Sequence, residues 1–300
     1  MMRSSTSTWM SGLGKAVASV SMRRMRRDDI AAADRLRALA GWNQTQEDWA
    51  RLLDWEPDGC FVAEQDATIV GSATSTTFGR DLAWVGMMLV DPERRRQGIA
   101  RCLLSRVLGW LESDRRVRSV ALDATPLGKT LYDTMGFTDA YTLHRREGIA
   151  PRLSARPGVQ PLSAACVPRL ARLDGRAFGA NRMRLLRDLV AGYPRGCFLL
   201  ERDGEPAGYA CSRPGSKRWY IGPAVAQTPE VADALLRAVL APLADQPAVM
   251  DVADGNAAAV AFAEAAGFMA VRPFIRMVRG APLPPADLDA CYAIIGPEVG

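Results

Sequence analysis

Hydrophobic and polar positions form a strand-turn-helix pattern in the N-terminal half of the chain. Residues 84–90 are an apolar run, and the polar stretch 91–98 follows it. A short apolar run bounded by turn residues is typical of a buried strand, whereas apolar residues spaced by three and four are typical of one helix face. The second spacing is found at Leu103, Leu104, Val107, Leu108 and Leu111. The pattern therefore predicts a strand, a turn and a helix.

Similar patterns predict the elements on either side. Thr45 and Asp48 have the spacing of a capping box, which predicts a helix that carries Trp49 into the core. Asp28 or Asp29 is expected to cap an earlier helix. The other expected elements are hairpin strands at 60–64 and 68–78, strands at 23–25 and 117–122, a helix at 129–135, and a strand at 138–145 that closes the sheet. Strands and helices mixed in this way indicate an α/β protein.

The second half of the chain repeats the first. Residues 59–73 align without gaps on residues 196–210, with seven identities in fifteen positions. Asp123, followed by Gly-Phe at 136–137, is matched by Asp251, followed by Gly-Phe at 267–268. Similarity in the same order along the chain indicates a tandem duplication of one fold.

A stretch with proline and glycine and little periodicity, at 151–161, is the expected domain boundary. We therefore expect one domain over 22–150, a second over 151–280, and a C-terminal extension over 281–300. Residues 1–21 are expected to be a disordered tail or to precede a later start codon at Met22 or Met25, with a transit peptide as the alternative.

Positive charge is concentrated at the N-terminus. The net charge is +5, but residues 1–27 hold six basic residues and no acid, so the rest of the chain is close to neutral. This distribution argues against a nucleic-acid partner. No apolar run approaches the ~18 residues that would span a bilayer, so no membrane partner is expected either.

Cysteine and histidine usage excludes several catalytic classes. The six cysteines show no C-x-x-C spacing, and His144 is the only histidine. This usage predicts reduced cysteines in a cytoplasmic protein without a metal site. A Ser-His-Asp or Cys-His mechanism would depend on that single histidine. We therefore expect any catalysis to use other groups.

The polar turn has the composition of an anion-binding site. Arg95, Gly98 and Ala100 give the spacing Arg-x-x-Gly-x-Ala at the start of the predicted helix. The first N–H groups of a helix lack intrahelical partners and carry partial positive charge, so they bind phosphate readily. Glycine lets the backbone approach such a ligand closely. On spacing alone, the alternative is a solvated charge run at an ordinary helix start.

The second copy lacks this turn. Residues 226–234 are three fewer than the matching residues 91–102 and include neither arginine nor glycine. Tyr132, four residues before a Gly-Phe pair, corresponds to Ala263 in the second copy. Because one copy lost both features, we predict that they serve a function beyond folding in the other.

These motifs resemble the acyl-CoA-binding core of the GNAT acyltransferase superfamily, whose turn reads Gln/Arg-x-x-Gly-x-Gly/Ala. The resemblance is carried by residues 90–93, 95–100, 131–132 and 136–137. Residues 41–45, 122–126, 178–182, 222–223 and 276–280 further resemble the two-domain YitH-type branch, in which a complete GNAT domain precedes a degenerate one. The resemblance implies an α/β (α+β) fold of two tandem GNAT-like domains, each a mixed, mostly antiparallel twisted sheet flanked by helices.

The resemblance also implies one acetyl-CoA site, in the N-terminal domain, and no metal. The pyrophosphate would lie on N–H groups of the turn, and the pantetheine on the strand before it. The implied cofactor-binding residues are Met88, Leu89, Val90, Arg95, Arg96, Gln97, Gly98, Ile99 and Ala100. A small-molecule amine would attack the thioester directly in a ternary complex, with proximity lowering the barrier. Tyr132 matches the family's proton donor to the departing thiolate.

The resemblance does not identify the general base or the residues that contact the acceptor, so the candidates come from their positions in the sequence. No carboxylate lies on the strand 84–90, so Asp123 and Glu64 are the candidate bases, with a capping role and a solvated strand position as their alternatives. The expected acceptor contacts are Trp42 and Asn43, on a connector between helices, and Asn181, Arg182 and Arg213 in the second domain. Asn181 stands where this branch has aspartate. A protein or peptide acceptor, a non-catalytic acyl-CoA sensor and an interaction scaffold remain alternatives, in a monomer or a homodimer.

Overall fold

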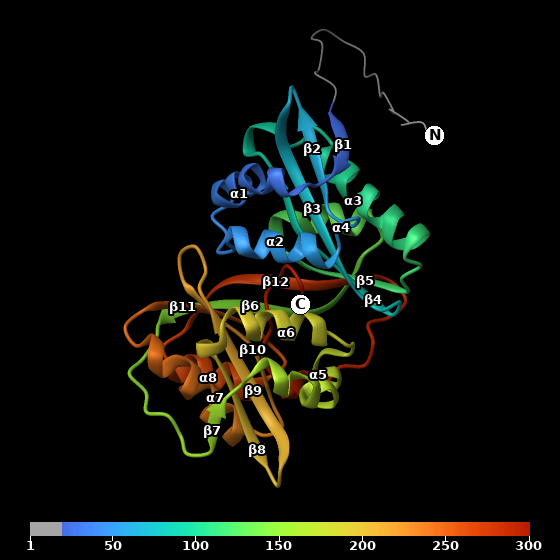
Figure 1. Cartoon of the computed structure of the whole chain (residues 1–300). Helices are drawn as coiled ribbons and strands as arrows, with labels where there is room; N and C mark the ends of the chain where they lie inside the picture. Colours follow the sequence, from blue (N-terminus) through green and yellow to red (C-terminus); the bar gives the residue numbers. More distant parts are fainter. Residues whose placement is uncertain (1–19) are drawn as a thin grey trace. The chain divides into compact units, whose positions relative to one another are not determined.

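Backbone contacts divide the computed structural model, which describes residues 20–300, into two units (Figure 1). One unit contains residues 20–75 and 87–114, and the other contains residues 76–86 and 115–300. Residues 1–19 of the expected tail lie outside the described residues, and Ser21 opens the first strand.

The first unit combines an antiparallel strand set with three helices. Its elements are β1 (Ser21–Arg24), α1 (Ile30–Leu39), α2 (Gln46–Trp55), β2 (Phe61–Gln65), the first part of β3 (Thr68–Phe78), the last part of β4 (Leu82–Val90) and α3 (Ile99–Gly109). β2 pairs with both β1 and β3. Asp66 and Ala67 connect β2 to β3 with φ of 49° and 59°, the backbone geometry of a tight hairpin turn. The predicted hairpin is therefore confirmed.

The helix starts of this unit agree in part with those expected. The Thr45 side chain accepts from the N–H of Asp48, and the Asp48 carboxylate accepts from the N–H of Thr45, so the capping box is confirmed. Trp49 is fully buried, as predicted. Asp29 directly precedes α1, but its carboxylate does not cap that helix. Instead it accepts two hydrogen bonds from Arg23, at 2.7 and 2.9 Å, which ties β1 to the start of α1.

The second unit is built on one mixed sheet. Its strands are the first part of β4, β5 (Ser119–Ala124), β6 (Thr138–Ile149), β7 (Val159–Pro161), β8 (Cys197–Arg202), β9 (Glu205–Arg213), β10 (Trp219–Ala226), β11 (Pro247–Ala253), β12 (Met269–Gly280) and β13 (Cys291–Ala293). They are ordered β4-β5-β12-β6-β11-β10-β9-β8-β7, with β13 beside β10. The pairs β4–β5 and β10–β11 are parallel, and the other described pairs are antiparallel. The predicted mixed, mostly antiparallel sheet is confirmed.

The last strands of the two repeats are exchanged. β12, from the second repeat, pairs with β5 of the first, and β6, from the first repeat, pairs with β11 of the second. β6 and β12 also pair with each other (Figure 1, green and red). The expectation that β6 closes the sheet of its own repeat beside β5 is therefore wrong. The limits 22–150 and 151–280 follow the sequence repeat and stay a prediction, because each repeat gives a strand to the other.

A buried ion pair fastens each exchanged strand. Arg276 of β12 donates to Asp123 of β5 at 2.9 and 3.0 Å, and Arg145 of β6 donates to Asp251 of β11 at 2.8 and 2.7 Å. The two arginines occupy the same place in their strands. The exchange therefore has the same polar anchor on both sides.

Helices pack against this sheet in both repeats. They are α4 (Pro126–Thr134), α5 (Ala171–Phe178), α6 (Met183–Gly192), α7 (Pro229–Leu240) and α8 (Ala257–Ala265). α7 and α8 cover an apolar core with β10 and β11. α4 begins three residues before the predicted helix, because Pro126 takes the first helical position and the Thr125 hydroxyl accepts from the N–H of Gly128. Both are helix-start signals present in the sequence.

Residues 281–300 lie in this second unit. β13 pairs with β10, and the residues after it stay buried, with Ile294 4%, Glu298 4% and Val299 2% exposed. A segment that returns to the core in this way contributes to stability as well as to the wall of any cavity nearby.

Candidate active site

The turn between β4 and α3 is open to solvent and has an unusual backbone. Arg95, Arg96, Gln97 and Gly98 are exposed, and Arg96 and Gly98 have φ of 61° and 81°. Positive φ is rare for a residue with a side chain such as arginine. The backbone is thus wound tightly just before the helix, and binding of a phosphate at this turn stays a prediction.

The start of α3 has no cap of its own. Gly98 is the residue before the helix, and no side chain accepts from the first N–H groups. A Cβ added at Gly98 would meet open space, with no atom within 4 Å. By contrast, at α7 the Thr228 hydroxyl accepts from the N–H of Val231, and Pro229 has no N–H to offer. The geometry at Gly98 therefore fits a phosphate, and that at α7 does not.

One residue of β4 has an unusual backbone conformation before the residues expected to hold the pantetheine. Met87 has φ 47° within the strand and is 1% exposed, and the Ser72 hydroxyl donates to its carbonyl at 2.9 Å. Positive φ is rare for a residue with a side chain. Met87 precedes Met88, Leu89 and Val90, of which Leu89 is buried and the others are half-buried. Sequence reasoning missed this conformation, since Met87 reads as one more apolar strand residue.

Tyr132 is held in α4 of the second unit. Its ring packs edge-on against Phe137, with centroids 5.9 Å apart, and the residue is 8% exposed. Burial raises the pKa of its hydroxyl above the ordinary value, because the phenolate would be poorly solvated. No charged or hydrogen-bonding neighbour among the described residues contributes to that shift. The hydroxyl therefore stays protonated, as a proton donor requires.

Both candidate bases are held by arginines. Asp123 has no exposed side-chain surface, and each of its oxygens accepts from Arg276. Asp123 therefore anchors the exchanged strand β12, and its role as a base stays a prediction. Glu64, on β2, accepts a hydrogen bond from Arg23 of β1 at 2.8 Å. Its role as a base stays a prediction.

The expected acceptor contacts of the first unit lie on a connector. Trp42 and Asn43 follow α1, with Trp42 half-buried and Asn43 7% exposed. The Trp42 carbonyl accepts from Arg37 at 3.2 Å, which holds the connector against the end of α1. Their contact with an acceptor stays a prediction.

The two arginines of the second repeat have structural partners. Arg182 is 3% exposed and donates to the buried Asp174, and Arg213, also 3% exposed, donates to Glu298 at 2.7 Å. Both arginines are therefore held in buried ion pairs, and their contact with an acceptor stays a prediction. Asn181 is exposed, and its side chain accepts from the N–H of Met183 at the start of α6.

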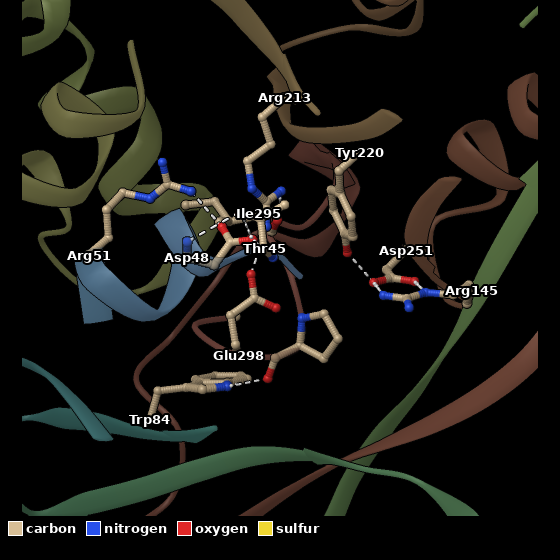
Figure 2. A network of polar contacts seen from close by, with 12 residues as sticks. Thr45, Asp48, Arg51, Trp84, Arg145, Arg213, Tyr220, Asp251, Ile295 and Glu298 are labelled. Atoms are coloured by element: carbon tan, nitrogen blue, oxygen red, sulfur yellow. Dashed lines mark hydrogen bonds and ion pairs between the residues drawn. The ribbon is translucent and has the colours of Figure 1, made fainter. Parts of the chain in front are cut away.

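The C-terminal segment reaches β4 where this strand leaves β5. The indole N–H of Trp84 donates to the carbonyl of Pro297 at 2.9 Å, and Glu298 lies beside Arg213 (Figure 2). A Cβ on Gly86 would lie 2.4 Å from the carbonyl oxygen of Glu298. Any residue other than glycine at this position would therefore clash with the C-terminal segment. No local pattern in the sequence indicated this contact, because its partners are more than 200 residues apart.

Within residues 20–300, no group of three or more histidine, cysteine or carboxylate side chains could hold a metal ion. In the same part of the chain, every helix is too short or too polar to cross a bilayer.

Two models of acetyltransferase families match the chain. The one described as "Acetyltransferase (GNAT) family" matches residues 22–137, and the one described as "Acetyltransferase (GNAT) domain" matches residues 170–293. The two matches cover most of the chain and give one GNAT domain to each repeat.

Relatives and solved structures agree with this assignment. YitH of Bacillus subtilis (strain 168), described as an uncharacterized N-acetyltransferase, is 26% identical over 216 residues, which cover 70% of this chain and 74% of YitH. The holothin acyltransferase of Pseudoalteromonas sp. (strain SANK 73390) is 25% identical over 201 residues, 67% of each chain. A candidate acetyltransferase from Pyrococcus horikoshii has the same fold, with a TM-score of 0.81 over 98% of this chain and 99% of its own, at 24% identity. The chain belongs to the GNAT acetyltransferase family, as an acyltransferase with two tandem GNAT domains.

Proposed function

We propose that this protein transfers the acetyl group of acetyl-CoA to a primary amine of a small molecule, by direct attack in a ternary complex. The observation that carries the proposal is the uncapped start of α3 after the exposed basic turn. The matching helix of the second repeat, α7, is capped by the Thr228 hydroxyl and begins with Pro229, which has no N–H. This difference supports one cofactor site per chain, in the N-terminal half.

The turn and the strand before it would hold the cofactor. N–H groups from Arg96 to Ala100 would bind the pyrophosphate, and the backbone of Met88 to Val90, which follows the positive φ of Met87, would bind the pantetheine. The thioester would then lie where β4 leaves β5, with an N–H of Leu89 or Val90 polarising its carbonyl. Acetyl-CoA supplies the activated acetyl group, so the chain needs no nucleophile of its own.

Tyr132 would donate its proton to the departing thiolate. Its hydroxyl is buried and protonated, which is the state that a general acid needs. Retention of this tyrosine and of the complete turn in one repeat favours catalysis over a role as acyl-CoA sensor or scaffold.

A small-molecule acceptor is favoured over a protein. The observation that supports this choice is that one relative is named for acyl transfer to holothin. A reducing compartment such as the cytoplasm is also proposed, because Cys197 and Cys211 lie opposite each other in β8 and β9 as free thiols.

Thiol release tests the proposed function. The full chain is incubated with acetyl-CoA and a broad panel of primary amines, and free CoA is followed with a thiol reagent. We expect at least one amine to release CoA well above the hydrolysis rate, with the acetylated amine detected by mass spectrometry. Tight CoA binding without turnover of any amine would contradict this function and favour a non-catalytic acyl-CoA sensor.

A further inference from the structure

Arg272 of β12 is a half-buried arginine that forms no ion pair with a carboxylate among residues 20–300. Over the same residues its side chain forms no hydrogen bond, and its Nε is buried without a partner. The guanidinium lies 4.9 Å from the centroid of the Phe274 ring. Removing a charged group from water costs free energy unless the protein or a ligand supplies a counter-charge. Arg272 is therefore a candidate for binding an anion.

The first repeat has a different residue at the matching position. Tyr141 and Arg272 each lie five residues after the glycine of the matched Gly-Phe pairs, and their strands have the same pattern of burial. In the pairing of β6 with β12, Tyr141 lies opposite Arg276, and Arg272 lies opposite Arg145. These are the same place in the two repeats. One repeat has a hydroxyl there, and the other has a second guanidinium.

The tyrosine completes the hydrogen bonding of the arginine opposite it. Arg276 and Arg145 each donate from Nε and Nη2 to the buried aspartate described above. Nη1 of Arg276 donates in addition to the Tyr141 hydroxyl. A guanidinium has donors only, so Arg272 cannot replace that hydroxyl as an acceptor. Nη1 of Arg145 therefore lacks the acceptor that Nη1 of Arg276 has.

The neighbours of Arg272 do not balance its positive charge. The charges that act on it come from Arg145, Asp251 and Glu147. Arg145 and Asp251 form one ion pair at 2.7 Å (Figure 2), and Glu147 forms another with Arg218 at 2.8 Å. Each of these carboxylates thus has an arginine of its own. One positive charge, that of Arg272, is left in excess.

This environment disfavours the charge of Arg272 but does not remove it. Burial and the neighbouring charge of Arg145 lower the pKa of the Arg272 guanidinium below its ordinary value. Asp251 and Glu147 act in the opposite direction and offset this lowering only in part. An arginine nevertheless stays protonated in proteins near neutral pH. A bound anion would therefore stabilise the folded protein.

The surroundings of Arg272 favour a carboxylate over other ligands. The donors of a guanidinium match the two oxygens of a carboxylate, and also those of a phosphate. One excess positive charge is neutralised by one negative charge. A phosphate dianion would bring a second negative charge close to Asp251 and Glu147, where like charges repel. A neutral molecule would leave the charge of Arg272 unbalanced.

We propose that Arg272 and Arg145 form a second binding site of this protein, which takes the carboxylate group of a small molecule. Arg272 pairs with the carboxylate directly. Arg145 offers Nη1 to it, as Arg276 offers its own to Tyr141. The site consists of one strand from each repeat, lies within the second unit, and is independent of the basic turn in the first.

A matched pair of ligands tests the charge requirement. Acetate and acetamide have nearly the same shape, but only acetate is charged at pH 8. Isothermal titration of the full chain at constant ionic strength should show acetate binding. Acetamide should bind at least about tenfold more weakly, because hydrogen bonds between charged partners are the stronger ones. Inorganic phosphate, a dianion at this pH, is titrated as the third ligand.

Variants test the position of the site. Arg272→Met should weaken acetate binding at least about tenfold, since it removes the charged donor. Arg118→Met removes an exposed arginine of the same unit and is the matched control, with no change expected. Gly98→Asp changes the candidate phosphate turn of the first unit, and it should also leave acetate binding unchanged.

Arg272→Tyr distinguishes a binding role from a structural one. It introduces the residue of the first repeat, whose hydroxyl can accept from Nη1 of Arg145. Acetate binding should be lost. In the absence of acetate, the midpoint of thermal unfolding should rise by about 2 °C or more, because the unbalanced charge is gone. An arginine that only supported the fold would give a lower midpoint instead. This variant also keeps the proposal testable if Arg272→Met folds poorly.

Several results would overturn the proposal. They are the absence of acetate binding to the wild-type chain, equal affinities for acetate and acetamide, and acetate binding that survives both Arg272→Met and Arg272→Tyr. Phosphate binding that depends on Arg272, and is tighter than acetate binding, would overturn the choice of a carboxylate. None of these results affects the proposed acyl transfer, because its test measures the release of free CoA.

Discussion

Replacing Arg145 with methionine is expected to lower the free energy of unfolding by about 3 to 5 kcal/mol. The substitution leaves Asp251 buried without its counter-ion, with the Tyr220 hydroxyl as the remaining side-chain partner that the structure gives it (Figure 2). Burial lowers the pKa of the Arg145 guanidinium, but the charge of Asp251 more than offsets this and raises it above the ordinary value. The Arg145 guanidinium is therefore charged throughout the neutral range. Urea unfolding measures the loss.

Two further variants show whether the loss comes from the unpaired charge. Arg145→Met combined with Asp251→Asn removes both charges and should regain most of the stability, because a neutral amide costs less to bury than a carboxylate. Arg118→Met breaks an exposed ion pair with Asp81 and should cost no more than about 1 kcal/mol. Equal losses in Arg145→Met and Arg118→Met would contradict an anchoring role for the buried pair.

Tyr132→Phe is expected to lower kcat by about 10²- to 10⁴-fold, the usual contribution of a general acid. Phenylalanine keeps the edge-on packing against Phe137, so the free energy of unfolding and the affinity for CoA should hardly change. Steady-state kinetics with a turned-over amine, together with CoA titration, measures both effects.

The pH dependence of the wild-type enzyme provides an independent check. A proton donor is lost as the pH rises through its pKa, and burial raises the pKa of Tyr132 above the ordinary value of 10.0. No loss of kcat from this group is therefore expected below that pH. Tyr193→Phe, which changes a half-buried tyrosine of the second repeat, is the control. A Tyr132→Phe enzyme with wild-type kcat would show that another group protonates the thiolate.

Local patterns in the sequence predicted the elements that local forces determine. The capping box of Thr45 and Asp48 and the buried Trp49 depend on neighbours within a few positions, and the structure confirms them. The turn before Gly98 was predicted for the same reason, since a helix start after glycine and arginines is a local signal.

Long-range pairing was not predictable in the same way. Asp123 was interpreted as a base because its partner, Arg276, lies 153 residues further along the chain. The exchanged strands β6 and β12 have the same pattern of burial, so the pattern cannot tell which strand lies beside β5. Arg213 was likewise expected to contact substrate, because nothing local indicates that Glu298 returns to it.

The number of CoA sites per chain tests the central claim most directly, that the first repeat alone binds the cofactor. Isothermal titration of CoA into the full chain should give one site. Gly98→Asp should weaken CoA binding by about tenfold or more. The added charge repels the pyrophosphate, and the positive φ at this position disfavours a side chain; each of these two effects costs on the order of 1 kcal/mol. Thr228→Asp, the same charge at the start of α7, should change nothing. Two sites per chain, or a Gly98→Asp variant with unchanged affinity, would contradict the account.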